Sequence, residues 1–186
     1  MFLNYIMHLV ISCSLNESSK SRMMAEYAYN LYCKDAKIID FQKIAFPICD
    51  GDTCYGKPIV NELKDTIENA RSILIASPIY NYDLNAVAKN LIELTGQSWT
   101  DKLVGFISAA GGKGSYMSPM SFVNSLMLDF RCLIIPRLVY ADKACFNDNG
   151  DMNDMIKVRI EELVDSSILL SRALIASKST SPDIPS

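Results

Sequence analysis

The stretch Ser72–Thr95, SILIASPIYNYDLNAVAKNLIELT, contains the segments from which the fold can be deduced. Its first residues, Ser72–Ala76, are too apolar to be exposed on either face of a sheet, which indicates a buried parallel strand. A loop follows at Pro78–Asp83, and Asn85–Thr95 has the apolar spacing of a helix that Gly96 ends. A strand followed by a helix is half of a unit in which helices join parallel strands.

The same alternation continues on both sides of this stretch. Further strands are predicted at Tyr5–Cys13, Lys37–Asp40, Leu103–Ser108 and Leu133–Tyr140, and further helices at Lys20–Cys33, Ile59–Asn69, Met117–Phe130 and Met152–Ala176. This pattern predicts an α/β fold with a five-stranded parallel sheet and helices on both faces. Five strands favour the flavodoxin-like three-layer sandwich, in strand order 2-1-3-4-5, over the six-stranded dinucleotide fold. We expect residues 1–176 to form one such domain and residues 177–186 to be a flexible polar tail.

The composition limits the partners of the chain. Its 186 residues are 49% hydrophobic and 21% charged, with a net charge of -3 and no basic run, so nucleic acid is not an expected partner. No apolar stretch approaches the roughly 20 residues that cross a bilayer, so no membrane partner is expected. The apolar start, Met1–Cys13, lacks the basic segment and cleavage site of a secretory leader, and a cytoplasmic location is therefore expected.

Six cysteines and one histidine make a metal site improbable, because no two cysteines have C-x-x-C spacing. Three of the cysteines lie in or beside apolar stretches, namely Cys33, Cys132 and Cys145. A reduced cysteine in such a place packs as a small hydrophobic residue. Cys49 and Cys54 instead flank a polar loop, CDGDTC, where a disulfide or a redox role stays open as an alternative. We expect His8 to be packed or exposed rather than catalytic.

The predicted topology also predicts where a ligand would bind. Ligands of doubly wound sheets lie outside the carboxyl ends of the strands, where the strand order reverses. That point lies between the first and third strands, with the fourth strand beside it. The three loops there, Ser12–Ser21, Ser77–Asp83 and Ser108–Ser115, are also the most distinctive loops of the sequence.

The first loop, SCSLNESSKSR, offers hydroxyl groups and backbone amides at the start of a helix. Its serines are Ser14, Ser18, Ser19 and Ser21. A helix start favours an anion, and Lys20 or Arg22 would add positive charge. The alternative is that these serines only cap the helix.

The other two loops suit an aromatic ligand. Tyr80 and Asn81 would supply an amphipathic ring and an amide beside the switch point, as a flat heterocycle requires. The glycines of SAAGGKGSY would allow backbone amides to approach a ligand edge closely. Each loop alone is equally compatible with an ordinary turn or a flexible hinge.

With these loops the sequence resembles the NADPH-dependent FMN reductases of flavodoxin-like fold. The family pattern G-S-L-R-x-x-S-x-N is similar to CSLNESSKS at Cys13–Ser21, and P-x-Y-N followed by K-N is similar to PIYNYDLNAVAKN at Pro78–Asn90. The serine- and glycine-containing loop after the fourth strand is similar to SAAGGKG at Ser108–Gly114. In the first motif, Cys13 stands where the family has glycine, and Asn16 stands where it has arginine.

The resemblance implies that the chain binds FMN and uses NAD(P)H as cosubstrate. The FMN phosphate would lie on Ser14, Asn16, Ser19, Lys20 and Ser21. The ring would lie against Pro78, Ile79, Tyr80 and Asn81, and its pyrimidine edge near Ser108, Ala109, Ala110, Gly111 and Gly112. The implied function is an FMN-dependent NAD(P)H oxidoreductase that passes electrons to a flavin, a quinone or a similar small acceptor. Because the cofactor carries the chemistry, no side chain is expected to act as acid, base or nucleophile. Tyr80, Asn81 and Tyr116 would shape the pocket.

Three other functions stay open. A flavodoxin-like electron carrier would bind flavin without turning over NAD(P)H. A low-molecular-weight phosphatase also has a cysteine after its first strand, but its Cys-x5-Arg loop would need arginine at the position of Ser19. A flavin-free binding protein is the third, because both departures from the family pattern lie in the phosphate loop.

The helix predicted at Met117–Phe130 indicates a homodimer or homotetramer. Its apolar residues are Met117, Met120, Phe122, Val123, Leu126, Met127, Leu128 and Phe130. Together they cover more of the helix than the roughly 100° stripe that packing on one sheet buries. A partner subunit would bury the rest, unless the last helix covers it.

Overall fold

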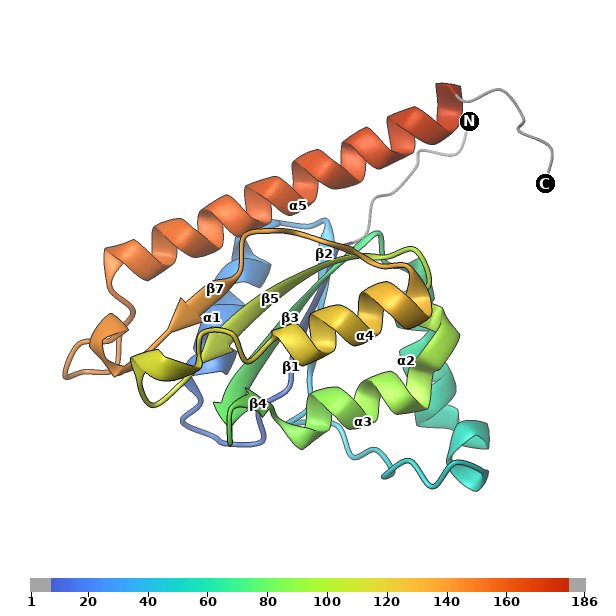
Figure 1. Cartoon of the computed structure of the whole chain (residues 1–186), viewed down its shortest axis with the longest axis horizontal. Coiled ribbons are helices and arrows are strands. Elements are labelled where there is room, and N and C mark those ends of the chain that lie inside the picture. Colours follow the sequence, from blue (N-terminus) through green and yellow to red (C-terminus); the bar gives the residue numbers. More distant parts are fainter. Residues whose placement is uncertain (1–7, 181–186) are drawn as a thin grey trace.

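The computed structural model describes the backbone of residues 8–180 and the side chains of residues 8–177. A parallel sheet forms the middle layer, in the order β2-β1-β3-β5-β6 (Figure 1). Its main strands are β1 (His8–Ser12), β2 (Ala36–Asp40), β3 (Ser72–Tyr80) and β5 (Leu103–Ala109). The predicted fold class and strand order are therefore confirmed, with β5 standing as the fourth strand of the prediction.

The predicted fifth strand, Leu133–Tyr140, is split into two short strands. These are β6 (Leu133–Ile134) and β7 (Val139–Ala141), and both pair with β5 in parallel. Pro136 lies between them and has no N–H with which to continue the ladder. Together with the short β4, this split raises the count to seven strands in the described part of the chain.

The predicted loop Pro78–Asp83 is instead a β-hairpin. β3 runs on through Tyr80, and β4 (Asp83–Leu84) pairs with it antiparallel. The two connecting residues, Asn81 and Tyr82, have φ values of 51° and 69°. Two consecutive left-handed residues are the signature of the two-residue hairpin turn whose twist matches that of the strands. This extension of the strand was not predicted from the sequence, because proline and tyrosine at positions 78 and 80 are residue types that are common in loops.

Within residues 8–180, five α-helices cover the sheet. They are α1 (Lys20–Leu31), α2 (Pro58–Asn69), α3 (Ala86–Thr95), α4 (Met120–Phe130) and α5 (Asp154–Thr180). α4 begins three residues later than predicted, because Pro119 is its N-cap. α5 continues four residues beyond the predicted end at Ala176, so the start of the expected tail is helical. Residues 181–186 of that tail lie outside the described residues. None of the helices within residues 8–180 is long and apolar enough to cross a membrane.

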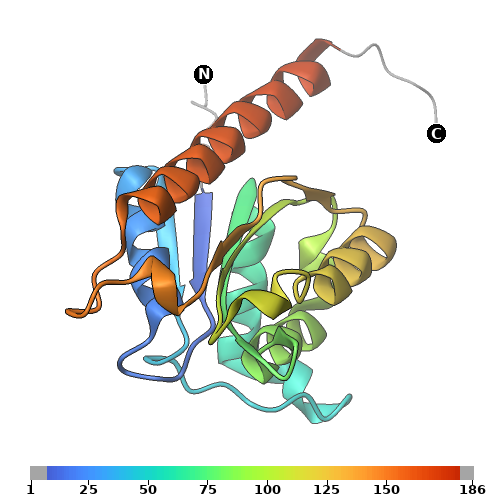
Figure 2. The same cartoon turned by 60° about the vertical axis from the view of Figure 1, so that its left-hand side comes forward.

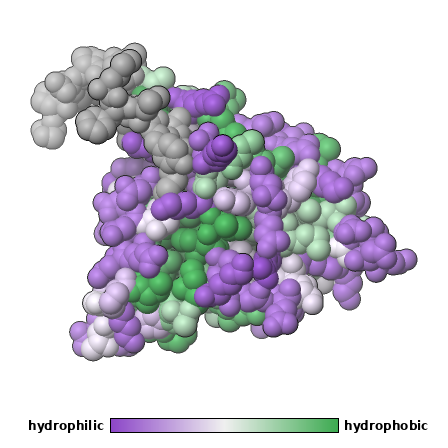
Figure 3. All heavy atoms as spheres, turned by 180° about the vertical axis from the view of Figure 1, so that it is seen from behind, coloured by the Kyte–Doolittle hydropathy of each residue, from purple (hydrophilic) through white to green (hydrophobic). Residues whose placement is uncertain are grey.

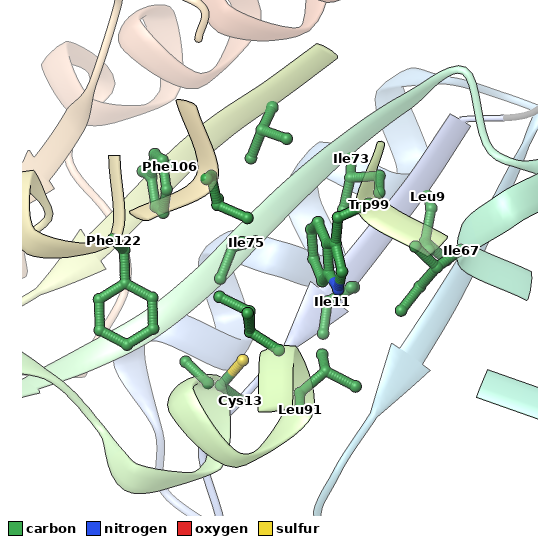
Figure 4. Close-up of a cluster of buried hydrophobic side chains, with 14 of the residues drawn as sticks. Leu9, Ile11, Cys13, Ile67, Ile73, Ile75, Leu91, Trp99, Phe106 and Phe122 are labelled. Carbon is green, nitrogen blue, oxygen red and sulfur yellow. The ribbon is translucent and has the colours of Figure 1, made fainter. Parts of the chain in front are cut away.

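Alternate strand residues face two separate cores. On one face, Leu9 and Ile11 of β1 pack with Ile73 and Ile75 of β3 under α2, α3 and α4, around the fully buried Trp99 (Figure 4). On the other face, the intervening residues pack under α1 and α5. Figure 2 shows α1 and α5 on one side of the sheet and α3 and α4 on the other. This is the three-layer arrangement that the alternation predicted.

Candidate functional site

A cleft lies at the carboxyl edge of the sheet, at the predicted switch point. It has a cavity volume of about 240 Å³ and is formed by the carboxyl ends of β3 and β5 and by the loops after β1, β5 and β7. Its lining consists of Ser14, Asn16, Ser18, Ser19, Lys20, Ser21, Pro78, Ile79, Tyr80, Ala109, Ala110, Gly111 and Lys143. All but three of the predicted site residues are therefore brought together here. The exceptions are Asn81, Ser108 and Gly112.

The first loop presents the start of α1 to the cleft. Ser19 is the N-cap, and its Oγ accepts the backbone N–H of Arg22 at 3.1 Å. Ser14 is buried, and its Oγ accepts the backbone N–H of Asn16 at 3.2 Å. A hydroxyl that accepts in this way keeps its own O–H to donate. The Ser19 and Ser21 hydroxyls also hydrogen-bond each other at 3.0 Å, which uses the proton of one of them. The serines thus cap and brace the loop, while Ser14 and one hydroxyl of the Ser19–Ser21 pair can still donate beside a helix start, a favourable place for an anion.

Two lysines add positive charge to this cleft. Lys20 begins α1, and its Nζ lies 4.4 Å from the centroid of the Phe146 ring. Lys143 is exposed and reaches the cleft from the loop after β7. Arg22, the other candidate from the sequence, is instead paired with Asp40 at 3.1 Å and Glu26 at 3.2 Å. The positive charge at the cleft therefore comes from lysines.

The end of β3 forms one wall of the cleft. Pro78 and Ile79 are apolar, and Tyr80 is 55% exposed at the mouth. Asn81 was predicted to shape the pocket, but its left-handed conformation in the hairpin turn places it outside the lining. Tyr116 is 60% exposed and also lies outside the lining. The wall is thus shorter and more apolar than the sequence suggested.

The glycine-containing loop after β5 forms the opposite edge. Ala109, Ala110 and Gly111 line the cleft. Ser108 lies within β5 and is 1% exposed, which places it beneath the lining rather than in it. The carbonyl of Gly112 is turned to Tyr140, whose hydroxyl donates to it.

Tyrosine hydroxyl groups hold this loop in place from two directions. Tyr140 also bonds the Ser115 hydroxyl at 2.9 Å, and the hydroxyl of Tyr82 donates to the Gly114 carbonyl at 2.7 Å. The loop therefore has fixed contacts at 112, 114 and 115, while Gly111 remains free of them. A Cβ built at Gly111 would meet no atom within 4 Å, so the chain itself leaves open space there.

Cys13 does not belong to the cleft. It is fully buried in the core under α3, beside Ile11 and Leu91 (Figure 4). Burial raises the pKa of its thiol to about 12, which leaves almost no thiolate at neutral pH. A phosphatase nucleophile would need the opposite, so this geometry argues against that alternative.

Sequence reasoning missed two residues of the lining, Ser18 and Lys143. Ser18 was counted among the hydroxyl groups of the first loop but was not assigned to the ligand. Lys143 follows β7, which is the end of the predicted fifth strand. From the sequence, the ligand was placed only at the loops after the predicted first, third and fourth strands. The position of Lys143 could have been predicted, because the loop after the last parallel strand also lies at the carboxyl edge of the sheet.

A second cavity, of about 330 Å³, lies at the opposite edge of the sheet. Arg71, Asp101 and Arg131 line it beside the C-terminal half of α5. It has no helix N-terminus and no aromatic wall in its lining. The cleft at the carboxyl edge is therefore the better candidate for a phosphate-bearing aromatic ligand.

The residues of the cleft fit such a ligand at both ends. Hydroxyl donors, a helix start and two lysines form an anion site, and Pro78, Ile79 and Tyr80 form a mainly apolar wall beside it. The cavity is smaller than the roughly 300–1,000 Å³ of sites that enclose their ligands. A flavin ring would therefore remain partly exposed in this chain. The fold and the cleft together define a flavodoxin-like protein with a candidate site for a phosphate-bearing aromatic ligand.

Comparison with known proteins places the chain within this class. The model of the NADPH-dependent FMN reductase family matches residues 7–145, and the chain belongs to that family. The predicted resemblance is thereby confirmed.

The names of individual relatives describe reductases and oxidoreductases. The chain is 31% identical over 112 residues to NAD(P)H:quinone oxidoreductase from Solanum tuberosum, covering 54% of this chain but only 57% of that protein. It is 27% identical over 130 residues to FMN reductase (NADPH) from Pseudomonas aeruginosa, covering 68% and 69% of the two chains. The structure of the flavoenzyme NAD(P)H:(acceptor) oxidoreductase FerB from Paracoccus denitrificans superposes with a TM-score of 0.74 at 19% identity, over 90% of this chain and 98% of that one. That likeness concerns the fold.

Proposed function

We propose that the protein is an FMN-dependent NAD(P)H oxidoreductase that passes electrons from a nicotinamide to a flavin, a quinone or a similar small acceptor. The observation that carries the proposal is the cleft itself, where an anion site and an apolar wall meet at the carboxyl edge of a flavodoxin-like sheet. The family membership and the names of the relatives support the same activity.

Each part of the cleft has a task in this function. The start of α1, the hydroxyls of Ser14 and Ser19, and the lysines Lys20 and Lys143 bind the phosphate of FMN. Pro78, Ile79 and Tyr80 support the ring, while the backbone at 109–111 borders its other edge. FMN, when bound, supplies the hydride and electron chemistry. The residues of the cleft therefore bind and orient, and none is assigned as acid, base or nucleophile.

An electron carrier without NAD(P)H turnover is the alternative. The exposed position of Tyr80 at the mouth favours the enzyme, because an open flavin face leaves room for a nicotinamide and then for an acceptor. The experiment is to reconstitute the protein with FMN, remove free flavin by gel filtration and follow NADPH and NADH oxidation with a quinone acceptor. Retained flavin with ping-pong turnover is expected. Retained flavin without turnover would favour the carrier, and loss of all flavin would contradict both.

We also propose that the protein acts as a homodimer or larger oligomer in the cytoplasm. Met127 and Leu128 of α4 are 50% and 75% exposed. The alternative was that the last helix covers these side chains, but α5 packs on the opposite face of the sheet with α1. A partner subunit is therefore the proposed cover for α4. The location is proposed because all six cysteines are free thiols, as is usual in a reducing compartment.

A further inference from the structure

Two cysteine side chains meet in the long loop between β2 and α2. The Sγ atoms of Cys49 and Cys54 lie 3.9 Å apart. Cys54 is 1% exposed, whereas Cys49 is only partly buried. The loop passes beneath α3 in Figure 1 and contributes no residue to the cleft described above.

The segment that joins the two cysteines is held by one carboxylate. Asp50 accepts the backbone N–H groups of Asp52 and Cys54, each at 3.0 Å, and the hydroxyl of Thr53 at 2.5 Å. Hydrogen bonds lower the pKa of Asp50, first that of the Cys54 thiol and that of the Thr53 hydroxyl, and then those of the two backbone N–H groups. The turn therefore has a defined shape that carries Cys54 back toward Cys49.

The other end of the segment is fixed to α3. The side chain of Asn90 accepts the backbone N–H of Cys49 at 2.8 Å and donates to the carbonyl of Pro47 at 2.8 Å. Asn90 is itself 7% exposed. The two sulfur atoms are thus brought together by hydrogen bonds at both ends of the loop rather than by chance proximity on a loose segment.

The two thiols differ in their surroundings and in the direction in which their pKa values are shifted. The Tyr55 hydroxyl lies 3.4 Å from Cys49 Sγ. Its hydrogen bond, together with one from the backbone of Gly51, lowers the pKa of Cys49. The same contact raises the pKa of Tyr55 to about 12, so the tyrosine keeps its proton and remains a donor. Burial, followed by the hydrogen bond to Asp50, raises the pKa of Cys54. An accessible, activated thiol therefore lies beside a shielded one.

We propose that Cys49 and Cys54 form a reversible dithiol–disulfide site that small-molecule disulfides oxidise, with Cys49, assisted by Tyr55, as the attacking thiol and Cys54 as the resolving thiol. Closure requires the sulfur atoms to approach to about 2 Å, a movement of roughly 2 Å. The site is distinct from the flavin cleft, and the proposal does not rest on the proposed function.

The electron balance is that of thiol–disulfide exchange. The Cys49 thiolate attacks one sulfur of a disulfide such as glutathione disulfide, and one glutathione thiolate leaves. Cys54 gives up its proton and attacks the Cys49 sulfur, which displaces the second glutathione. The cysteine pair loses two electrons and two protons, and one glutathione disulfide becomes two glutathione molecules.

The other cysteines determine how the test is designed. Burial raises the pKa of Cys132 to about 11 and also raises that of Cys145, and Cys13 is fully buried. Cys33 is exposed and would form a mixed disulfide of its own. The full-length chain carrying Cys33→Ser is therefore the starting protein, used both with and without added FMN.

The experiment treats this protein with glutathione disulfide and follows intact mass and free thiols over time. The expected product has lost two hydrogen atoms, carries no glutathionyl group and returns to the starting mass with dithiothreitol. Cys54→Ser in the same background should retain one glutathionyl group at Cys49. Cys49→Ser should react several-fold more slowly, and Tyr55→Phe should slow the first step without changing the product. Circular dichroism and thermal unfolding check that each variant is folded.

Several results would overturn the proposal. One is a stable glutathionyl group in the starting protein, which would mean that Cys54 cannot reach Cys49. Another is a Cys49→Ser variant that reacts as fast as the starting protein. An unchanged rate in folded Tyr55→Phe would contradict the assigned role of the tyrosine.

Discussion

At the scale of single residues, the two departures from the family pattern in the first loop, Cys13 and Asn16, have different consequences for the cleft. Cys13 fills a core position under α3 and is not part of the cleft lining. Asn16 lines the cleft, and its Oδ1 accepts the backbone N–H of Ser18 at 2.9 Å. Of the two departures from the family pattern, only the one at Asn16 therefore bears on phosphate binding.

We predict that Asn16→Arg tightens FMN binding several-fold. A guanidinium is permanently charged and planar, and hydrogen bonds to charged groups contribute about 1 kcal/mol more than neutral ones. Riboflavin lacks the phosphate, so its affinity should not change. Fluorescence titration with both flavins tests this, with Asn16→Met as the uncharged control of similar length. Equal tightening of riboflavin, or tightening by Asn16→Met, would place Asn16 away from the phosphate.

Gly111→Ala should weaken FMN binding without destabilising the fold. The chain leaves open space around Gly111, so a methyl group meets only what occupies the cleft. Gly56 also has open space around it but lies outside the cleft, and Gly56→Ala is the matched control. Both variants should unfold within about 0.5 kcal/mol of the parent in urea, as surface substitutions do. Equal FMN affinity in the two variants would contradict the placement of the ring edge.

His8 should make stability depend on pH. It is 4% exposed, its Nδ1 lies 2.6 Å from the Ser72 hydroxyl, and burial lowers its pKa to about 4. The unfolded chain takes up this proton near pH 6.5 and the folded chain does not until about pH 4. The free energy of unfolding therefore falls as the pH is lowered through this window, by up to about 3 kcal/mol.

The measurement is urea unfolding of the parent and of His8→Gln between about pH 7 and about pH 4.5. The glutamine variant lacks this titration, so the gap in stability between the two proteins should narrow as the solution becomes more acidic. A gap that stays constant would show that His8 takes up its proton at the same pH in the folded and the unfolded chain, and that burial does not lower its pKa.

At the scale of elements, the β3–β4 hairpin has the least expected structure. Its turn places Asn81 at a φ of 51°, which asparagine and glycine adopt more readily than other residues. We predict that Asn81→Ala destabilises the protein by about 1 kcal/mol, because the added strain has no compensation. Asn81→Gly should keep the parent stability and FMN affinity. If both variants lost FMN binding equally, the asparagine side chain would contact the flavin after all.

Another element-scale feature is the close packing of α5 on the sheet. A Cβ at Gly105 of β5 would lie 2.7 Å from Leu74 Cδ2 and 3.0 Å from Leu163 Cδ1. A larger residue at this position would force the end of the Leu74 side chain of β3, and that of Leu163 of α5, to shift. This close packing helps to hold α5 against β5, and the end of β5 borders the cleft.

At the scale of the whole molecule, the exposed side of α4 is the proposed subunit contact. We predict that Leu128→Glu converts the oligomer to a monomer, because a carboxylate in a buried apolar contact is costly. Leu169 of α5 is 67% exposed, and Leu169→Glu is the control. Light scattering at micromolar concentration measures both. The rear surface also has an apolar area bordered by hydrophilic side chains (Figure 3). An unchanged oligomer in Leu128→Glu would contradict the contact through α4 and make that area the next candidate.

Features that depend on local periodicity and on topology could be predicted from the amino-acid sequence. Strand residues such as Ser72–Ala76 are recognisable because burial on both faces requires continuous apolar side chains. The strand order then predicts that the loops after the first, third and fourth strands meet, and they do meet at the cleft. That rule identified the three loops, and the family resemblance supplied the individual residues expected there, most of which line the cleft.

The direction of each side chain, and its contacts with residues distant in the sequence, are visible only in the folded protein. Arg22 is drawn away from the cleft by Asp40, Asn81 is placed in a turn, and Lys143 arrives from the fifth strand. Cys49 and Cys54 meet because Asn90 and Asp50 hold the loop. Sequence spacing does not give the direction of a side chain, since that is set by hydrogen bonds and packing with residues that only the fold brings near.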